Sequence, residues 1–135
     1  MISYINSIES VSTKNIKGFF VNWPNPPSTE KHYEVLKNSS YIWLALDNET
    51  NDIVGFVTAI SDNVLSAYIP LLEVLPEYQG KGIGTQLVKL MLETLEDFYM
   101  VDLLCDEDLT EFYSKFGMLK SRGMVIRNYD KQCGR

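Results

Sequence analysis

The sequence predicts a single α/β domain built on a mixed, mostly antiparallel β-sheet. Three apolar, strand-like segments lie between residues 41 and 75 and are separated only by short polar turns, which favours antiparallel pairing. From residue 83 the apolar positions follow steps of three and four, the spacing of an amphipathic helix. Another apolar segment follows at 100–105, and a strand–helix–strand order over 65–105 implies one parallel pair of strands. With 135 residues, 45% of them hydrophobic, the chain is the size of one domain with a real core.

The first predicted helix follows a proline-rich loop, NWPNPPSTE, at residues 22–30. Ser28 and Thr29 are N-cap candidates, and acidic residues in the first turns favour a helix there. Apolar residues at helical spacing extend this helix to Lys37. The chain's one histidine, His32, lies among polar residues, and we expect it to be solvated.

Three strands follow, and the third contains a proline. They are predicted at YIWLALD (41–47), IVGFVTAI (53–60) and LSAYIPLLEVL (65–75). Pro70 has no N–H to donate to a sheet, so we expect a bulge or a partly unpaired edge around it.

The segment after the long helix predicts a short buried strand, MVDLLC at 100–105, which places Cys105 in the core. The next stretch, DEDLTEFYSKFG, predicts a helix that Asp106 or Asp108 caps and Gly117 ends. A last strand is predicted within MLKSRGMVIRNY, residues 118–129.

The composition excludes several classes of protein. A net charge of −6 and a pI near 4.7 argue against a nucleic-acid binder, because neutralising phosphates requires a basic face. No apolar run reaches the ~20 residues of a membrane span, and the first residues lack a signal-peptide layout, so we expect no membrane contact and a cytoplasmic location. Cys105 and Cys133 are predicted to be free thiols, and no Cys/His cluster suggests a metal.

Three of the eight glycines crowd into PEYQGKGIGTQL, residues 76–87, where the long helix begins. A phosphate-binding P-loop would require Gly-Lys-Ser/Thr, which is missing here, and a dinucleotide fingerprint would place glycine where Thr85 stands. A simple tight turn would require only one glycine. We interpret Gly80, Gly82 and Gly84 as leaving successive N–H groups unscreened at a helix N-terminus, where a diphosphate can bind. Lys81 and the Thr85 hydroxyl would add a charge and a hydrogen bond.

Two segments carry a family resemblance. VLPEYQGKGIGTQLV resembles the first signature of the GNAT superfamily of acyl-CoA N-acyltransferases, and FYSKFGM resembles its second signature. The element order over residues 41–128 is also similar. The resemblance implies the acyl-CoA N-acyltransferase fold, with helices on both faces of the sheet and a splayed parallel pair of strands.

The resemblance also implies where acetyl-CoA would bind. The pyrophosphate would lie on the loop formed by Gln79, Gly80, Lys81, Gly82, Ile83, Gly84 and Thr85. The pantetheine arm would pair with backbone groups of Leu72 and Val74, and Asp106 stands where relatives carry an asparagine near that arm. Strand 65–75 would diverge from strand 100–105 near Val74 to admit the acyl arm. No metal is implied.

The implied reaction is direct transfer of an acetyl group to an amine in a ternary complex. Backbone N–H groups at the split would hold the thioester carbonyl. Tyr113 would be the general acid for the leaving thiolate, although it also fits the apolar stripe of its helix. Glu73, on the strand face opposite Leu72 and Val74, is a candidate general base or else a solvated carboxylate.

The acceptor is expected to be a primary amine of a small molecule or peptide. Aromatic residues Phe19, Phe20, Trp23 and Tyr68 could line its pocket, or each could be core. The acidic surface favours cationic amines. Two alternatives to an enzyme stay open, namely an acyl-CoA sensor without catalysis and a nucleotide-binding interaction domain. A homodimer is also possible.

Overall fold

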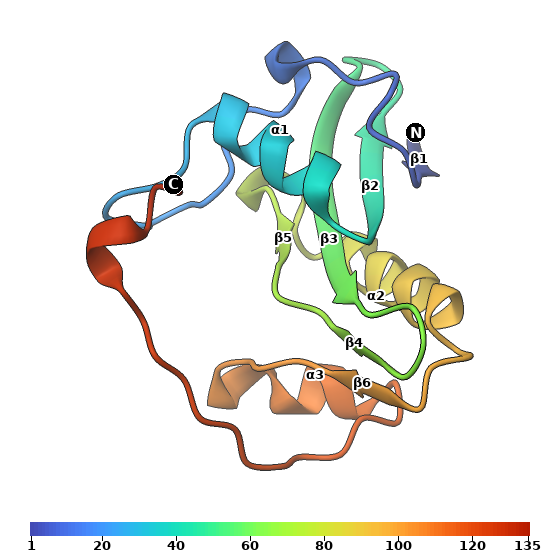
Figure 1. Ribbon diagram of the computed structural model, residues 1–135. Helices are drawn as coiled ribbons and strands as arrows, with labels where there is room; N and C mark the ends of the chain where they lie inside the picture. The colour runs from blue at the N-terminus through green and yellow to red at the C-terminus, as the bar shows by residue number, and fades with distance from the viewer.

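The computed structural model describes residues 1–135 and contains one six-stranded mixed sheet with a helix on each face (Figure 1). The strands and helices are β1 (Ile2–Ile5), α1 (Thr29–Asn38), β2 (Tyr41–Asp47), β3 (Asp52–Ser61), β4 (Ser66–Tyr68), β5 (Leu72–Val74), α2 (Ile83–Thr94), β6 (Met100–Asp102) and α3 (Thr110–Ser114). Short 3₁₀ turns lie at 13–15, 76–78, 107–109 and 129–131.

The sheet has the order β1-β2-β3-β4-β6, and β5 also pairs with β3. All pairs are antiparallel except β4–β6, so the predicted meander and the single parallel pair are both confirmed. Strand β1 was not predicted, because its four residues show neither strict alternation nor a clear turn signal.

The predicted strand 65–75 is two strands, β4 and β5, separated at Pro70. Strand β3 pairs with β5 at Val57↔Leu72 and with β4 at Ile60↔Tyr68. Between these two pairs β3 has two residues, 58–59, whereas the segment that joins β4 to β5 has three, 69–71. The one extra residue is the expected bulge. Bulges bend a strand. On one side of this bulge the Ile69 N–H donates to the backbone carbonyl of Asp102 at 2.9 Å, and on the other the Leu71 carbonyl accepts from the Thr58 N–H at 3.0 Å. The chain therefore changes partner across Pro70, and β5 does not pair with β6.

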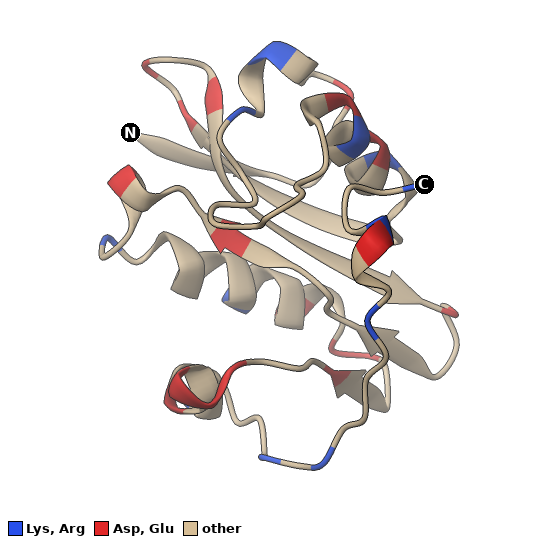
Figure 2. Cartoon of the chain, turned by 90° about the vertical axis from the view of Figure 1, so that its left-hand side faces the viewer, with Lys and Arg blue, Asp and Glu red and all other residues tan.

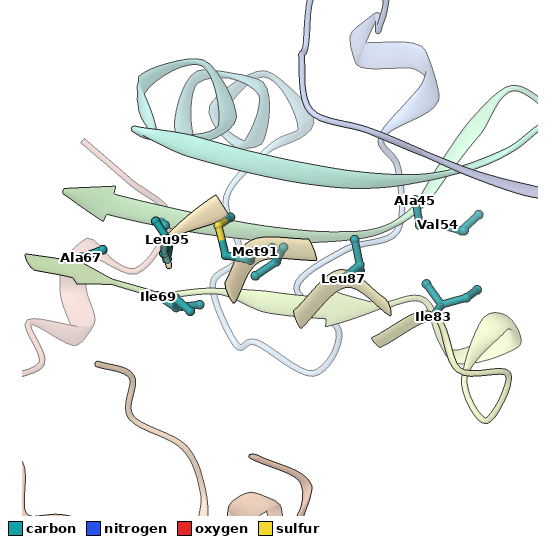
Figure 3. Packing of buried hydrophobic residues seen from close by; sticks show 10 residues of the cluster. Ala45, Val54, Ala67, Ile69, Ile83, Leu87, Met91 and Leu95 are labelled. Atoms are coloured by element: carbon teal, nitrogen blue, oxygen red, sulfur yellow. The ribbon is translucent and has the colours of Figure 1, made fainter. Parts of the chain in front are cut away.

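The two faces of the sheet carry separate apolar cores. Ile83, Leu87 and Met91 of α2, and Leu95 directly after it, pack on one face at helical spacing, as Figure 3 shows. The other face packs against α1 and the N-terminal segment, through Ile16, Phe20 and Leu36. The predicted arrangement of helices on both faces is thus confirmed.

Helix α1 begins as predicted, since the Ser28 hydroxyl accepts from the Lys31 N–H at 3.1 Å. The expectation of a solvated His32 is wrong, because its side chain is only 1% exposed. Its ring lies against Phe19, Phe20 and Phe56, with centroids 4.4 to 5.2 Å apart, and its Nε2 atom has no hydrogen-bond partner. Burial lowers the pKa of His32 from 6.5 to about 4.

Because His32 is buried, we expect the free energy of unfolding to fall in acid. A group with a lowered folded-state pKa takes up a proton more readily when unfolded, so stability falls as the pH drops from 6.5 through 4. The His32 contribution to this loss at pH 4 is about 3 kcal/mol. Urea unfolding of the native chain and of His32→Leu at pH 7, 5.5 and 4 measures it. If the free energy of unfolding of His32→Leu fell with pH as much as that of the native chain, His32 would not be the cause of the loss.

Two expectations for the C-terminal third are wrong. Strand β6 covers only residues 100–102 and is the edge of the sheet, so Met100 is partly exposed rather than buried. The last strand predicted within 118–129 does not form, and Leu119 and Met124 are more than 90% exposed. Local β-propensity does not suffice without a hydrogen-bonded partner strand. Here the segment meets the side chain of Leu104 near Gly123 rather than the backbone of β6.

The end of the chain returns to the loop that precedes α1. The Asn25 N–H donates to the Gln132 side chain at 2.8 Å, and the Lys31 ammonium group contacts the Arg135 carbonyl. Acidic and basic residues are dispersed over the elements, and no basic face is seen in the view of Figure 2. None of the helices has both the length and the apolar character of a membrane span.

Candidate active site

The bend at Pro70 opens a cleft of about 880 Å³ between β5 and the segment that connects β6 to α3. Leu72, Glu73 and Gln79 line one side. Cys105, Asp106 and Tyr113 line the other. Phe20 and Trp23 close the end toward α1. Seven residues that the sequence analysis proposed for the site, from four parts of the chain, therefore line one cavity. Cys105, which was expected in the core, lines it as well.

The glycine-rich loop lies at the Gln79 end of this cleft. Gly80 and Gly82 have φ angles of +76° and +83°, in the left-handed region that L side chains rarely adopt. Gly84 differs, because its φ is ordinary and a Cβ there would make only van der Waals contact with Val74 and Phe112. Two of the three glycines are thus required by backbone conformation.

The amides of this loop are unpaired. The N–H groups of residues 80–85 donate to no acceptor in the protein, and the first helical bond runs from the Gln86 N–H to the Gly82 carbonyl at 3.1 Å. Unpaired amides at the positive end of a helix dipole are the kind of group that can bind an anion. Among the predicted ligands, Ile83 is 3% exposed and belongs to the core, so only its N–H group is available. Lys81 and Thr85 are exposed at the rim.

The turn before the loop is fixed to the sheet. The Tyr78 hydroxyl donates to Asp47 at the end of β2, with 2.6 Å between the oxygens. This bond holds the pKa of Asp47 below its ordinary value and the pKa of Tyr78 above its own. The Lys81 ammonium lies 5.4 Å from the centre of the Tyr78 ring. The loop therefore has a rigid base.

Strand β5 presents an unpaired edge to the cleft. Leu71 and Leu75 direct their backbone bonds to β3, and in an antiparallel ladder the groups of Leu72 and Val74 then point the opposite way. The Leu72 and Val74 side chains pack with the α2 core, as expected. Gln79 donates from its side chain to the Val74 carbonyl at 2.9 Å, a bond that the sequence did not predict.

Tyr113 lies across the cleft from β5. It is 9% exposed, and its hydroxyl has no hydrogen-bond partner in the protein. Burial, and to a lesser degree an electrostatic interaction with Cys105, raises the pKa of Tyr113 to about 12. The phenol therefore stays protonated at neutral pH and can donate to a group in the cleft.

As the alternation predicts, the Glu73 side chain lies on the other face of the sheet from those of Leu72 and Val74. Its cross-strand partner on β3 is Phe56. Glu73 is not simply solvated. Its two carboxylate oxygens accept the N–H groups of Phe20 at 2.9 Å and Val21 at 3.2 Å. Each oxygen keeps a further lone pair, so Glu73 anchors the loop before α1 and stays a candidate base.

Of the other candidates, Asp106 lines the cleft and precedes the 3₁₀ turn at 107–109, but its side chain makes no capping bond. Phe20 and Trp23 line the cleft. Phe19 instead packs between His32 and Phe56, and Tyr68 borders a separate cavity of about 730 Å³ beside Tyr99. Two of the four predicted aromatic residues therefore line the cleft.

The sequence analysis missed Cys105. We expected it in the core, but it is exposed and lines the cleft, because β6 ends at Asp102 and the next residues leave the sheet. Its apolar neighbours in VDLLC gave no signal of this position.

The sequence and the fold of the chain are similar to those of known acetyltransferases. Residues 8–118 match the model of the acetyltransferase (GNAT) family. The chain is 34% identical over 109 residues to "Histone acetyltransferase TAP1" of Glycine max, and the matched region covers 72% of this chain and 46% of that protein. An "Uncharacterized N-acetyltransferase ycf52" of Pyropia yezoensis is 31% identical over 104 residues, 74% of this chain and 59% of that one. The chain thus spans about half the length of these curated relatives.

Two solved structures are similar over nearly all of the chain. One, from Deinococcus radiodurans R1 and described by name as an acetyltransferase, has a TM-score of 0.96 at 39% identity, covering 99% of this chain and 93% of that chain. The other, a GNAT family acetyltransferase from Streptococcus pneumoniae, has a TM-score of 0.71 at 29% identity, covering 95% and 98%.

Proposed function

The chain belongs to the GNAT acetyltransferase family, and from this premise we propose that it transfers the acetyl group of acetyl-CoA directly to a primary amine. The observation that carries the proposal is the row of unpaired amides at residues 80–85, at one end of a cleft that Tyr113 lines further along. A charged diphosphate is the kind of group that such amides bind.

The residues of the cleft suit the parts of the cofactor. The amides of Gly80–Thr85 would hold the diphosphate, and the edge of β5 that no strand covers, at Leu72 and Val74, would pair with the amide groups of the pantetheine arm. The Val74 carbonyl already accepts from the Gln79 side chain, so Val74 would contribute chiefly its N–H. Bound acetyl-CoA supplies an acetyl group activated as a thioester. N–H groups of the β5 edge would stabilise the negative charge that develops on the thioester oxygen.

Two side chains would manage protons. Tyr113 would donate a hydrogen bond to the thiolate as it leaves, and Glu73 would accept the proton of the attacking amine, directly or through a water molecule. Asp106, at the same cleft wall, would accept a hydrogen bond from the pantetheine arm but cannot donate one.

For the acceptor we propose a primary amine on a small molecule or on a peptide. Phe20 and Trp23 would contact its carbon skeleton, and the net charge of −6 would attract a cation. A lysine-bearing peptide is one candidate, because the similar soybean protein is named a histone acetyltransferase.

Calorimetry with acetyl-CoA, followed by a panel of polyamines, aminoglycosides and lysine peptides with thiol release as the readout, tests the proposal. We expect binding, a rise in thermal stability with ligand concentration, and turnover with at least one amine. Binding without turnover across a broad panel would favour the acyl-CoA sensor. ADP competing as well as CoA would favour the nucleotide-binding domain.

The Glu73→Gln variant tests the proposed base. At pH 7 an alkyl amine with a pKa of about 10.4 is mostly protonated, so we expect kcat/KM to fall about tenfold when the base is removed. The deficit should shrink as the pH approaches 10, because a neutral amine needs no base. Steady-state kinetics from pH 7 to 10 measure this. A deficit that is equal at every pH would mean that Glu73 only anchors Phe20 and Val21.

A further inference from the structure

Cys105 is a reactive group in the cleft to which the proposed reaction gives no task. It is exposed, and the chain's other thiol, Cys133, does not line the cleft. The Cys105 side chain lines the same cleft as Tyr113. A thiol at this position would face the sulfur end of any bound coenzyme A.

Tyr113 supplies an independent sign that a ligand belongs there. Its side chain is more than nine-tenths buried at 9% exposure, and its hydroxyl has no partner in the protein although it lines the cleft. A buried phenol normally finds a hydrogen-bond partner. The hydroxyl opens on the cleft that Cys105 also lines, so it is available to a ligand that replaces water there.

We propose that Cys105 is a modification site for disulfides of coenzyme A. The inference rests on the proposed function, because the same amides at residues 80–85 would bind the diphosphate of the CoA half. Holding that half in the cleft raises the effective concentration of its disulfide next to Cys105 into the millimolar range. A disulfide without the CoA half has no such advantage.

The step is thiol–disulfide exchange. The Cys105 thiolate attacks the CoA sulfur of a mixed disulfide, a new bond forms between Sγ and that sulfur, and the old sulfur–sulfur bond breaks. The departing thiolate takes a proton from solvent. Cys105 is oxidised to a disulfide, and the departing half is reduced to a thiol. The linked CoA then fills the cleft, so acetyl-CoA cannot bind until a reductant releases it.

The test uses two probes that differ only in one half, the mixed disulfide of CoA and glutathione, and glutathione disulfide. Intact mass and peptide mapping follow the modification of the reduced full chain. We expect the CoA probe to label Cys105 about tenfold faster or more than glutathione disulfide does, and acetyl-CoA to protect the site. Cys105→Ser should lose the fast label, and Cys133→Ser, which alters a thiol outside the cleft, should keep it.

Equal rates for the two probes, or equal labelling of Cys133, would overturn the inference and leave Cys105 as an ordinary exposed thiol. Calorimetry with CoA on the Cys105→Ser chain separates this failure from that of the proposed function. If CoA binds and the selective label is missing, only the modification is wrong. If CoA does not bind, both proposals fall.

Discussion

The Gly80→Ala/Gly82→Ala double variant is expected to bind acetyl-CoA about 30- to 900-fold more weakly than the native chain. Both glycines have φ angles near +80°, where an alanine costs about 1–2 kcal/mol each. The free loop can relax away from that conformation because a Cβ at either position meets no atom within 4 Å. Binding must then restore the strained loop, and the combined cost of about 2–4 kcal/mol appears in the dissociation constant.

Isothermal calorimetry measures the change, and two further variants show its cause. Gly117→Ala introduces the same strain at a φ of +87° after α3, away from the loop, so it should lower stability without a comparable loss of affinity. Gly84→Ala adds a methyl group at an ordinary φ and should weaken binding far less than the double variant. Native affinity in a folded double variant would contradict the role of these amides.

The loop was predictable because its signal is local. Glycine spacing, the helix start at Ile83 and the resulting unpaired amides all lie within a few residues of sequence, and no distant contact is needed to produce them. Tyr113 was proposed through the family resemblance of FYSKFGM, because apolar spacing alone would have assigned it to the apolar stripe of its helix. The break at Pro70 follows from a missing backbone N–H, which is a property of one residue.

Two of the errors concern burial, which depends on residues far away in sequence. His32 has polar neighbours in the chain, but Phe19, Phe20 and Phe56 enclose it in the fold. Cys105 has apolar neighbours in the chain, but β6 ends early at the sheet edge and leaves it in the cleft. The anchoring of Phe20 by Glu73 joins positions 53 residues apart, and no local pattern marks such a bond.

The bulge connects the fold to the proposed chemistry. If β4 and β5 formed one regular strand, β6 could continue its parallel ladder along β5 and cover the groups of Leu72 and Val74. The extra residue at 69–71 instead turns β5 away after the Ile69–Asp102 bond, and the cleft occupies the space beside it. A sheet defect specified by one proline thus provides both an unpaired edge and access to Tyr113.

Tyr113→Phe is expected to lower kcat about 10- to 150-fold while the affinity for acetyl-CoA stays within about twofold. With its pKa raised to about 12, the phenol holds its proton far more tightly than a thiol with an ordinary pKa near 8.5. It should therefore stabilise the leaving thiolate by a charge-assisted hydrogen bond rather than by complete proton transfer. Such a bond contributes about 1.5–3 kcal/mol, which gives the predicted range.

The pH dependence distinguishes this role from general acid catalysis with an ordinary phenol. Because the raised pKa keeps Tyr113 protonated through pH 10, the ratio of native to variant kcat should be constant between pH 6 and pH 10. Tyr99→Phe removes an exposed hydroxyl outside the cleft and serves as the matched control. A ratio that declines above pH 9 would show that the hydroxyl ionises there, and the buried, protonated donor would then be the wrong description.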